Sequence, residues 1–194
     1  MGAKVGVTLD DVLDAALTIA DERGLAAVTL TETASALGIR TPSLYNHVGG
    51  LEGLRRQLRL RGAAALAMAF RAVDAGGEPA HVLRALARAY RRFARQRPGL
   101  YEAIQPAVAP GEDDQLYAAL QEPVLVVVDV LRRVPLADPD LIPAVRAFRA
   151  MLHGFADLER RGGFGMPVDI DSSFEMSIDL VIDGLLGHAQ PSRT

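Results

Sequence analysis

The chain has 194 residues, a formal net charge of −3 and a hydrophobic fraction of 49%. This length allows one or two small domains with real cores, and the net charge argues against a protein that binds polyanions through a general excess of positive charge. The absence of cysteine excludes a disulfide framework, a thiolate metal site and a cysteine nucleophile.

The N-terminal residues lack the basic and apolar pattern of a signal peptide, and no apolar run approaches the ~20 residues of a membrane-spanning helix. We therefore expect a cytoplasmic protein that makes no use of a membrane.

The first predicted element is an amphipathic helix over residues 9–24, with the sequence LDDVLDAALTIADERG. Thr29 and Glu32 then show the spacing of a capping box, so a second helix is predicted to begin after Thr29. Gly38 can adopt the left-handed conformation that ends a helix, and Ile39 can pack back on the last turn.

A third helix of some seven residues is predicted next, with the hydroxyl of Thr41 as its cap and Pro42 at its first helical position. Leu44 and Val48 are predicted to face inward. The remaining side chains form a polar outer surface: Thr41, Ser43, Tyr45, Asn46 and His47. This pattern is typical of a helix-turn-helix, whose second helix enters the DNA major groove.

The alternative is a helical hairpin that binds nothing. A structural helix this short is hard to explain by the packing of two large apolar side chains alone, so the polar surface favours DNA binding. Local charge agrees, because residues 31–61 carry five arginines against two glutamates: Arg40, Arg55, Arg56, Arg59 and Arg61 against Glu32 and Glu52.

Residues 9–58 resemble the DNA-binding domain of TetR-type transcriptional repressors through the AAVTL link, the ALGI turn, the P-x-LYNHV helix and the following L-x-x-L. The resemblance implies an all-α protein that binds double-stranded operator DNA as a homodimer. It places a three-helix helix-turn-helix domain at residues 1–56 and a helical ligand-binding and dimerisation domain at residues 57–194.

The implied DNA-binding residues lie in or just before the two helices of the motif: Thr29, Thr31, Arg40, Thr41, Pro42, Ser43, Tyr45, Asn46 and His47. Tyr45 and His47 are expected on the DNA backbone, and the first turns of the recognition helix at base edges. The chain departs from the family at Gly50, where a lysine is usual, and at Arg40, where a small hydroxyl residue is common. Arg40 could supply the phosphate contact that the lysine would have made.

The rest of the chain is predicted to be helical over residues 51–75, 79–96, 100–109 and 112–134, the last with a bend at Pro123. Its segment VLVVVDVL could be a buried strand by its β-branched content, but helix is preferred because no partner strand is apparent. Apolar residues on every side of that helix would then imply burial at the centre of the second domain.

Two later stripes of large apolar residues have helical spacing and predict a four-helix dimer interface, with two helices from each subunit. The alternative is that both stripes fill their own subunit's core. The stripe residues are Leu141, Val145, Phe148, Leu152 and Phe155, then Phe174, Ile178, Val181 and Leu185.

The segment FRAMLHGFADLERRGGFG resembles the C-terminal domain of a TetR subgroup that carries a Trp-His-Gly motif. His153 and Gly154 are present, whereas the chain contains no tryptophan.

No sequence pattern supports catalysis. The four histidines lack zinc-ligand spacing, and neither G-x-S-x-G, a P-loop nor G-x-G-x-x-G occurs. We therefore predict no enzyme activity, no metal and no cofactor. The rival interpretations are a helical scaffold whose helix-turn-helix no longer binds DNA, and an enzyme built on a helical bundle.

The predicted function is that of a repressor that leaves a palindromic operator when a mostly apolar small molecule binds. The two sites would be coupled by linkage. Predicted ligand contacts are apolar or aromatic residues of the middle helices: Tyr90, Phe93, Tyr101, Ile104, Tyr117, Val124, Val128, Phe148 and Met151.

Overall fold

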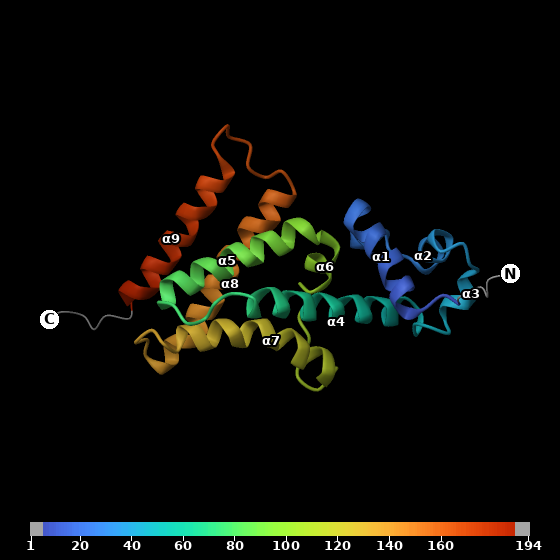
Figure 1. Ribbon diagram of the computed structural model, residues 1–194, viewed down its shortest axis with the longest axis horizontal. Helices are drawn as coiled ribbons and strands as arrows, with labels where there is room; N and C mark the ends of the chain where they lie inside the picture. The colour runs from blue at the N-terminus through green and yellow to red at the C-terminus, as the bar shows by residue number, and fades with distance from the viewer. Residues whose placement is uncertain (1–5, 189–194) are drawn as a thin grey trace. The chain divides into compact units, whose positions relative to one another are not determined.

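The computed structural model describes residues 6–188, and over this range it contains nine α-helices, two 3₁₀ turns and no strand (Figure 1). The predicted all-α fold is confirmed. The helices are α1 (Leu9–Arg23), α2 (Leu30–Ala36), α3 (Thr41–Leu44), α4 (Gly50–Arg71), α5 (Pro79–Gln96), α6 (Pro98–Ala103), α7 (Asp114–Leu131), α8 (Leu141–Arg160) and α9 (Ile170–His188), and the 3₁₀ turns are Leu25–Ala27 and Asp138–Asp140. None of these helices, among the residues described, has the length and apolar character needed to cross a bilayer.

The chain forms two compact units that do not follow the sequence order. The first contains the described residues up to Ala65 together with Arg97–Leu120, and the second contains Leu66–Gln96 together with the described residues from Gln121 onward. The first unit therefore adds α6 and the start of α7 to the helices of the predicted helix-turn-helix domain.

The first unit is built around α1, which begins with a complete capping box. Thr8 Oγ1 accepts a hydrogen bond from the backbone N–H of Asp11, and the Asp11 carboxylate accepts one from the Thr8 backbone N–H. The apolar face of α1 is buried, with Val12 and Ala16 fully inaccessible to solvent. This face provides a rigid support for the helices that follow it.

Helix α6 packs tightly on α1 and α4 within this unit. Asp21 of α1 accepts a hydrogen bond of 2.7 Å from the backbone N–H of Gly99. Gly62 of α4 faces Ile104, where an added Cβ would come within 2.7 Å of the Ile104 Cγ2 atom. The same Cβ would lie 3.0 Å from the backbone carbonyl oxygen of Leu100, so glycine at position 62 permits the close approach of the α6 backbone.

The start of α7 is held to α4 by an ion pair. Arg56 donates hydrogen bonds of 2.5 and 3.0 Å to the carboxylate of Asp113. These bonds, with one from the backbone N–H of Leu116, lower the pKa of Asp113 from 3.8 to about 2.

Because this folded-state pKa lies below the ordinary value, the pair stabilises the protein above pH 3.8 and loses its effect as the pH falls toward about 2. We therefore expect Asp113→Asn to lower the free energy of unfolding at neutral pH but not at pH 2. Chemical denaturation of both proteins at several pH values would measure the difference. A difference that is constant with pH would contradict the prediction.

Helix α7 confirms the preference for helix over strand in VLVVVDVL, and Pro123 lies inside it. The predicted burial on every side is wrong, because Leu125 is 52% exposed in the subunit. Apolar residues on all faces of a helix allow every face to be buried. The number of neighbouring helices then determines how much of the helix surface is buried.

Three predicted boundaries are also corrected. Helix α4 ends at Arg71, four residues earlier than residue 75, α6 spans Pro98–Ala103 instead of residues 100–109, and α7 spans Asp114–Leu131 instead of residues 112–134. Helix ends depend on the last hydrogen-bonded turn, which the apolar pattern does not specify.

In the second unit, α5, α8 and α9 pack against one another (Figure 1). Their shared core contains Leu83 and Leu86 of α5, Phe148 and Leu152 of α8, and Ile178 of α9, all 2% exposed or less. This packing buries most of the large apolar residues of the α8 and α9 stripes within the subunit.

Candidate DNA-binding helix-turn-helix

The first helix of the motif, α2, begins as predicted after Thr29, whose hydroxyl accepts a hydrogen bond of 3.1 Å from the backbone N–H of Glu32. The reciprocal half of the capping box is not formed, because the Glu32 carboxylate instead pairs with Arg23 at 2.6 Å. That exposed pair links α2 to the end of α1.

The turn of the motif has the hydrogen bonds of a Schellman motif. Gly38 has a φ of +66°, its N–H donates to the carbonyl of Ser35, and the N–H of Ile39 donates to the carbonyl of Ala34. The predicted left-handed glycine is confirmed. This turn determines the direction in which α3 leaves α2.

Helix α3 differs from its prediction in start and length. It begins at Thr41, with Arg40 as the cap residue and no side-chain cap bond, so Thr41 is not the cap and Pro42 is the second helical residue. Only Thr41–Leu44 is α-helical, because the N–H groups of residues 45–47 bond to carbonyls three residues earlier, in tighter turns.

The division of residues 41–48 into an inner and an outer face is as predicted. Leu44 and Val48 are 0% and 4% exposed. The predicted DNA-binding residues all retain accessible surface: Thr29, Thr31, Arg40, Pro42, Ser43, Tyr45 and Asn46 are exposed, and Thr41 and His47 are half-buried. The structure thus brings seven of the nine together on the recognition helix and its turn, with Thr29 and Thr31 at the start of α2.

Gly50 occupies the position where the family usually has lysine, and its backbone suits glycine. Its φ is +77°, a conformation that L side chains rarely adopt. A Cβ there would lie 3.8 Å from the ring of Tyr45. A lysine at position 50 would therefore be strained in this backbone conformation.

The basic excess of residues 31–61 is mostly engaged within the protein, which corrects its interpretation as a DNA-facing charge. Arg55 pairs with Glu52, Arg56 with Asp113, and Arg61 with Asp14, while Arg59 donates to the carbonyl of Pro106. Most of these partners are distant in sequence. Among the described residues, Arg40 alone of the five has no ion-pair or hydrogen-bond partner, so it is the arginine most available to DNA.

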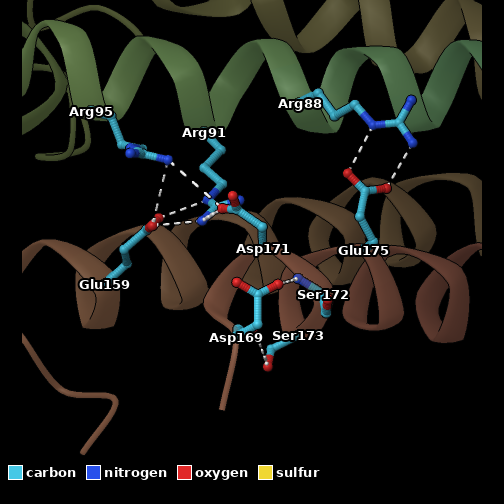
Figure 2. A network of polar contacts seen from close by, with 9 residues as sticks. All are labelled: Arg88, Arg91, Arg95, Glu159, Asp169, Asp171, Ser172, Ser173 and Glu175. Atoms are coloured by element: carbon cyan, nitrogen blue, oxygen red, sulfur yellow. Dashed lines mark hydrogen bonds and ion pairs between the residues drawn. The ribbon is translucent and has the colours of Figure 1, made fainter. Parts of the chain in front are cut away.

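A ladder of ion pairs that was not predicted from the sequence joins α5 to α8 and α9, and Figure 2 shows its pairs at Arg88, Arg91 and Arg95. Arg84 pairs with Asp179 at 2.8 Å, and Arg88 pairs with Glu175 at 2.7 Å. Arg91 pairs with both Glu159 of α8 and Asp171 at 2.6 and 2.7 Å. The signal was present in the sequence, since arginines and acidic residues recur every three or four positions on both helices.

Arg91 is the buried member of this ladder. Its side chain is 9% exposed, and its guanidinium lies 4.6 Å from the centre of the Phe174 ring. The hydrogen bonds from Arg91 to Glu159 and Asp171 raise the pKa of Arg91. This side chain joins the end of α8 and the start of α9 to α5.

The two apolar stripes lie mainly in the subunit's own core. Six of the nine predicted interface residues have 8% exposure or less: Val145, Phe148, Leu152, Phe155, Phe174 and Ile178. Their assignment to the interface is corrected, because a side chain without accessible surface in the subunit has none left to bury against a partner. Leu141, Val181 and Leu185 are half-buried and stay predictions.

The predicted ligand contacts are divided between the two units. Tyr101, Ile104 and Tyr117 belong to the first unit, and the other six belong to the second: Tyr90, Phe93, Val124, Val128, Phe148 and Met151. Tyr90, Phe93, Val128 and Phe148 are buried, and the Tyr90 ring packs against Phe70 with 6.5 Å between ring centres. The six residues of the second unit remain predicted contacts for an apolar ligand.

Comparison with known proteins agrees with this architecture. Residues 83–181 match the family model described as Tetracyclin repressor-like, C-terminal domain. The chain is 34% identical over 189 residues to an uncharacterized HTH-type transcriptional regulator, YobS of Bacillus subtilis (strain 168), and the match covers 96% of each protein. It is 32% identical over 177 residues to the HTH-type transcriptional repressor DrrR1 of Streptomyces coeruleorubidus, covering 84% of this chain and 60% of that protein.

Solved structures share the fold over nearly the whole chain. The crystal structure of SCO4313 has a TM-score of 0.73 and 26% identity, and the match covers 92% of this chain and 95% of that one. ActR of Streptomyces coelicolor in complex with (S)-DNPA has a TM-score of 0.65 and 20% identity, covering 96% and 100%. The helix-turn-helix geometry, the family model and the match to YobS over nearly its full length agree. The chain belongs to the TetR family of helix-turn-helix transcriptional regulators.

Proposed function

We propose that this regulator is a repressor that binds a palindromic operator as a homodimer and is released by a mostly apolar small molecule. The exposed polar face of α3, held outward by the buried Leu44 and Val48, is the observation that carries the proposal. The printed name of DrrR1 as a repressor supports the direction of regulation, and the ActR complex supports small-molecule control.

A gel-shift experiment with the DNA upstream of the protein's own gene would test the proposal. We expect a specific complex that survives excess unrelated DNA and weakens as salt rises, because phosphate contacts release counterions. If a genome-wide binding selection yielded no specifically bound fragment, the alternative of a helical scaffold that does not bind DNA would be favoured.

Tyr45 is proposed to contact a phosphate, since its side chain is 62% exposed at the edge of α3. We expect Tyr45→Phe to weaken binding to operator and unrelated DNA by a similar factor, because phosphate contacts position the protein without reading sequence. Fluorescence anisotropy with both DNAs would measure the two factors. A loss confined to the operator would instead assign Tyr45 to sequence reading.

Arg40 is proposed to read a base, because it is exposed and unpaired within the described chain and directly precedes α3. A bidentate contact with guanine contributes about 1–3 kcal/mol of discrimination. We therefore expect Arg40→Ala to relax the base preference at one position of each half-site in a binding selection. Weaker binding with an unchanged preference would make Arg40 a phosphate contact that replaces the family's lysine.

The proposed control is a coupling between effector and operator. The effector would weaken operator binding by favouring a conformation in which the recognition helices are poorly spaced. Operator DNA must then weaken effector binding by the same factor, which corresponds to a coupling free energy of typically about 1–3 kcal/mol. Within the first unit, the bond from Gly99 of α6 to Asp21 of α1 gives α6 a direct mechanical link to the helix that supports the motif.

We propose that the dimer contact involves the exposed faces of α8 and α9. These faces take the place of the buried stripe residues as the predicted interface. Met176 and Leu180 lie one turn apart on α9 and are 66% and 70% exposed in the subunit. Ile142 and Leu158 of α8 are about half exposed but lie on opposite flanks of that helix, so the proposed contact is centred on α9. Exposed apolar residues on two packed helices are typical of a surface that is buried in an oligomer.

A further inference from the structure

A basic pocket lies between α5 and α9 in the second unit. Its volume is about 370 Å³, and its polar lining consists of Arg88, Arg91, Arg92, Arg95, Gln96 and Glu175. Four guanidinium groups face the one lining carboxylate, Glu175. Glu159 and Asp171 pair with Arg91 and lie within 4 Å of Arg95, so the four positive charges meet three negative ones in total. The side chains come largely from one face of α5, where residues three and four positions apart are neighbours.

Two of the four arginines are occupied. Arg88 donates two hydrogen bonds to Glu175, at 2.9 and 2.7 Å. Arg91 makes two bonds to Glu159 and one to Asp171 (Figure 2). The single carboxylate of the pocket lining is thus already neutralised by Arg88.

The other two arginines donate no hydrogen bond among residues 6–188, although Arg95 forms loose ion pairs with Glu159 and Asp171. Arg92 is exposed and has no polar partner among residues 6–188. Arg95 Nη1 lies 3.9 Å from Glu159 Oε1 and 3.8 Å from Asp171 Oδ1, too far for hydrogen bonds, and its side chain is 61% exposed. The two arginines are adjacent on the helix surface, and the amide of Gln96 follows Arg92 by one turn.

We propose that this pocket binds a small anionic ligand through a carboxylate or phosphate group held by Arg92 and Arg95. Guanidinium groups recognise both anions with paired, charge-assisted hydrogen bonds. Arg88 and Arg91, fixed by their ion pairs, would add long-range attraction without moving. This site differs in chemistry from the proposed apolar effector site, so it would be a second ligand site, in the second unit of the protein.

Calorimetric titration of the full-length protein at low salt would test the site, with pyrophosphate as a phosphate probe and citrate as a carboxylate probe. We expect saturable binding of at least one probe, and the stronger of the two would identify the preferred anion. Arg92→Gln combined with Arg95→Gln is expected to weaken that binding by about tenfold or more, since the charge-assisted hydrogen bonds of both guanidinium groups are lost. Arg149→Gln, which removes an exposed charge from α8, is the matched control and is expected to bind normally.

Several results would overturn the proposal. Binding of both probes weaker than about 1 mM, or binding that is unchanged in the double variant, would mean that these arginines serve only to offset the helix dipole at the end of α5. An equal loss in Arg149→Gln would indicate general charge attraction. Dissociation of the dimer by the double variant in sedimentation would instead place the pocket at the subunit interface. Operator binding by the double variant, measured without either probe, is a separate readout that tests the repressor proposal independently.

Discussion

Leu180→Arg is expected to convert the protein into a folded monomer that no longer binds its operator. Leu180 is 70% exposed on α9, so the subunit tolerates a charge there, whereas a two-fold contact would have to bury it unpaired. A monomer reads only half of a palindrome. Operator affinity should therefore fall much more than affinity for unrelated DNA.

Ile178→Arg is the matched comparison, two residues away on the same helix. Ile178 is 0% exposed in the subunit core, so the charge would be buried without a partner even in a monomer, and we expect the second unit to unfold. Sedimentation and circular dichroism of both variants would distinguish the two effects. A Leu180→Arg protein that stays dimeric would move the interface away from this face of α9, and a folded Ile178→Arg monomer would restore the stripe to the interface.

Arg91→Met is expected to lower the free energy of unfolding by about 3 kcal/mol, because it removes both hydrogen bonds from the largely buried carboxylate of Glu159. The side chains of Arg91 and Glu159 are only 9% and 15% exposed, and the guanidinium also packs on the Phe174 ring. The loss should appear as a lower midpoint of urea unfolding.

Arg88→Met is the control for this effect, because Arg88 and Glu175 form a similar pair at 53% and 43% exposure. Solvent screens such a pair, and we expect a loss of less than about 1 kcal/mol. Adding Glu159→Gln to Arg91→Met should recover part of the stability, since the buried charge is then removed. Equal losses in the two single variants would show that burial does not distinguish the pairs.

The helix-turn-helix could be derived from the sequence because its signals act over a few residues. Thr29 caps α2, Gly38 takes the left-handed conformation of the turn, and Leu44 and Val48 mark the inner face of residues 41–48. The exposed residues of the recognition helix follow from the same pattern. The length of α3 did not, because the tighter turns after Leu44 depend on how the chain enters α4.

The tertiary structure decided what covers each apolar face and which partner each charge finds. Helical spacing identified the apolar stripes of α8 and α9 but could not separate core from interface, since both need the same apolar side chains. The packing of α5 against α8 and α9 buries Phe148 and Ile178 in the core of the subunit. Arg56 finds Asp113 across 57 positions of sequence, and Arg91 finds Glu159 across 68. Local composition cannot specify such pairs, because they exist only once the helices have packed.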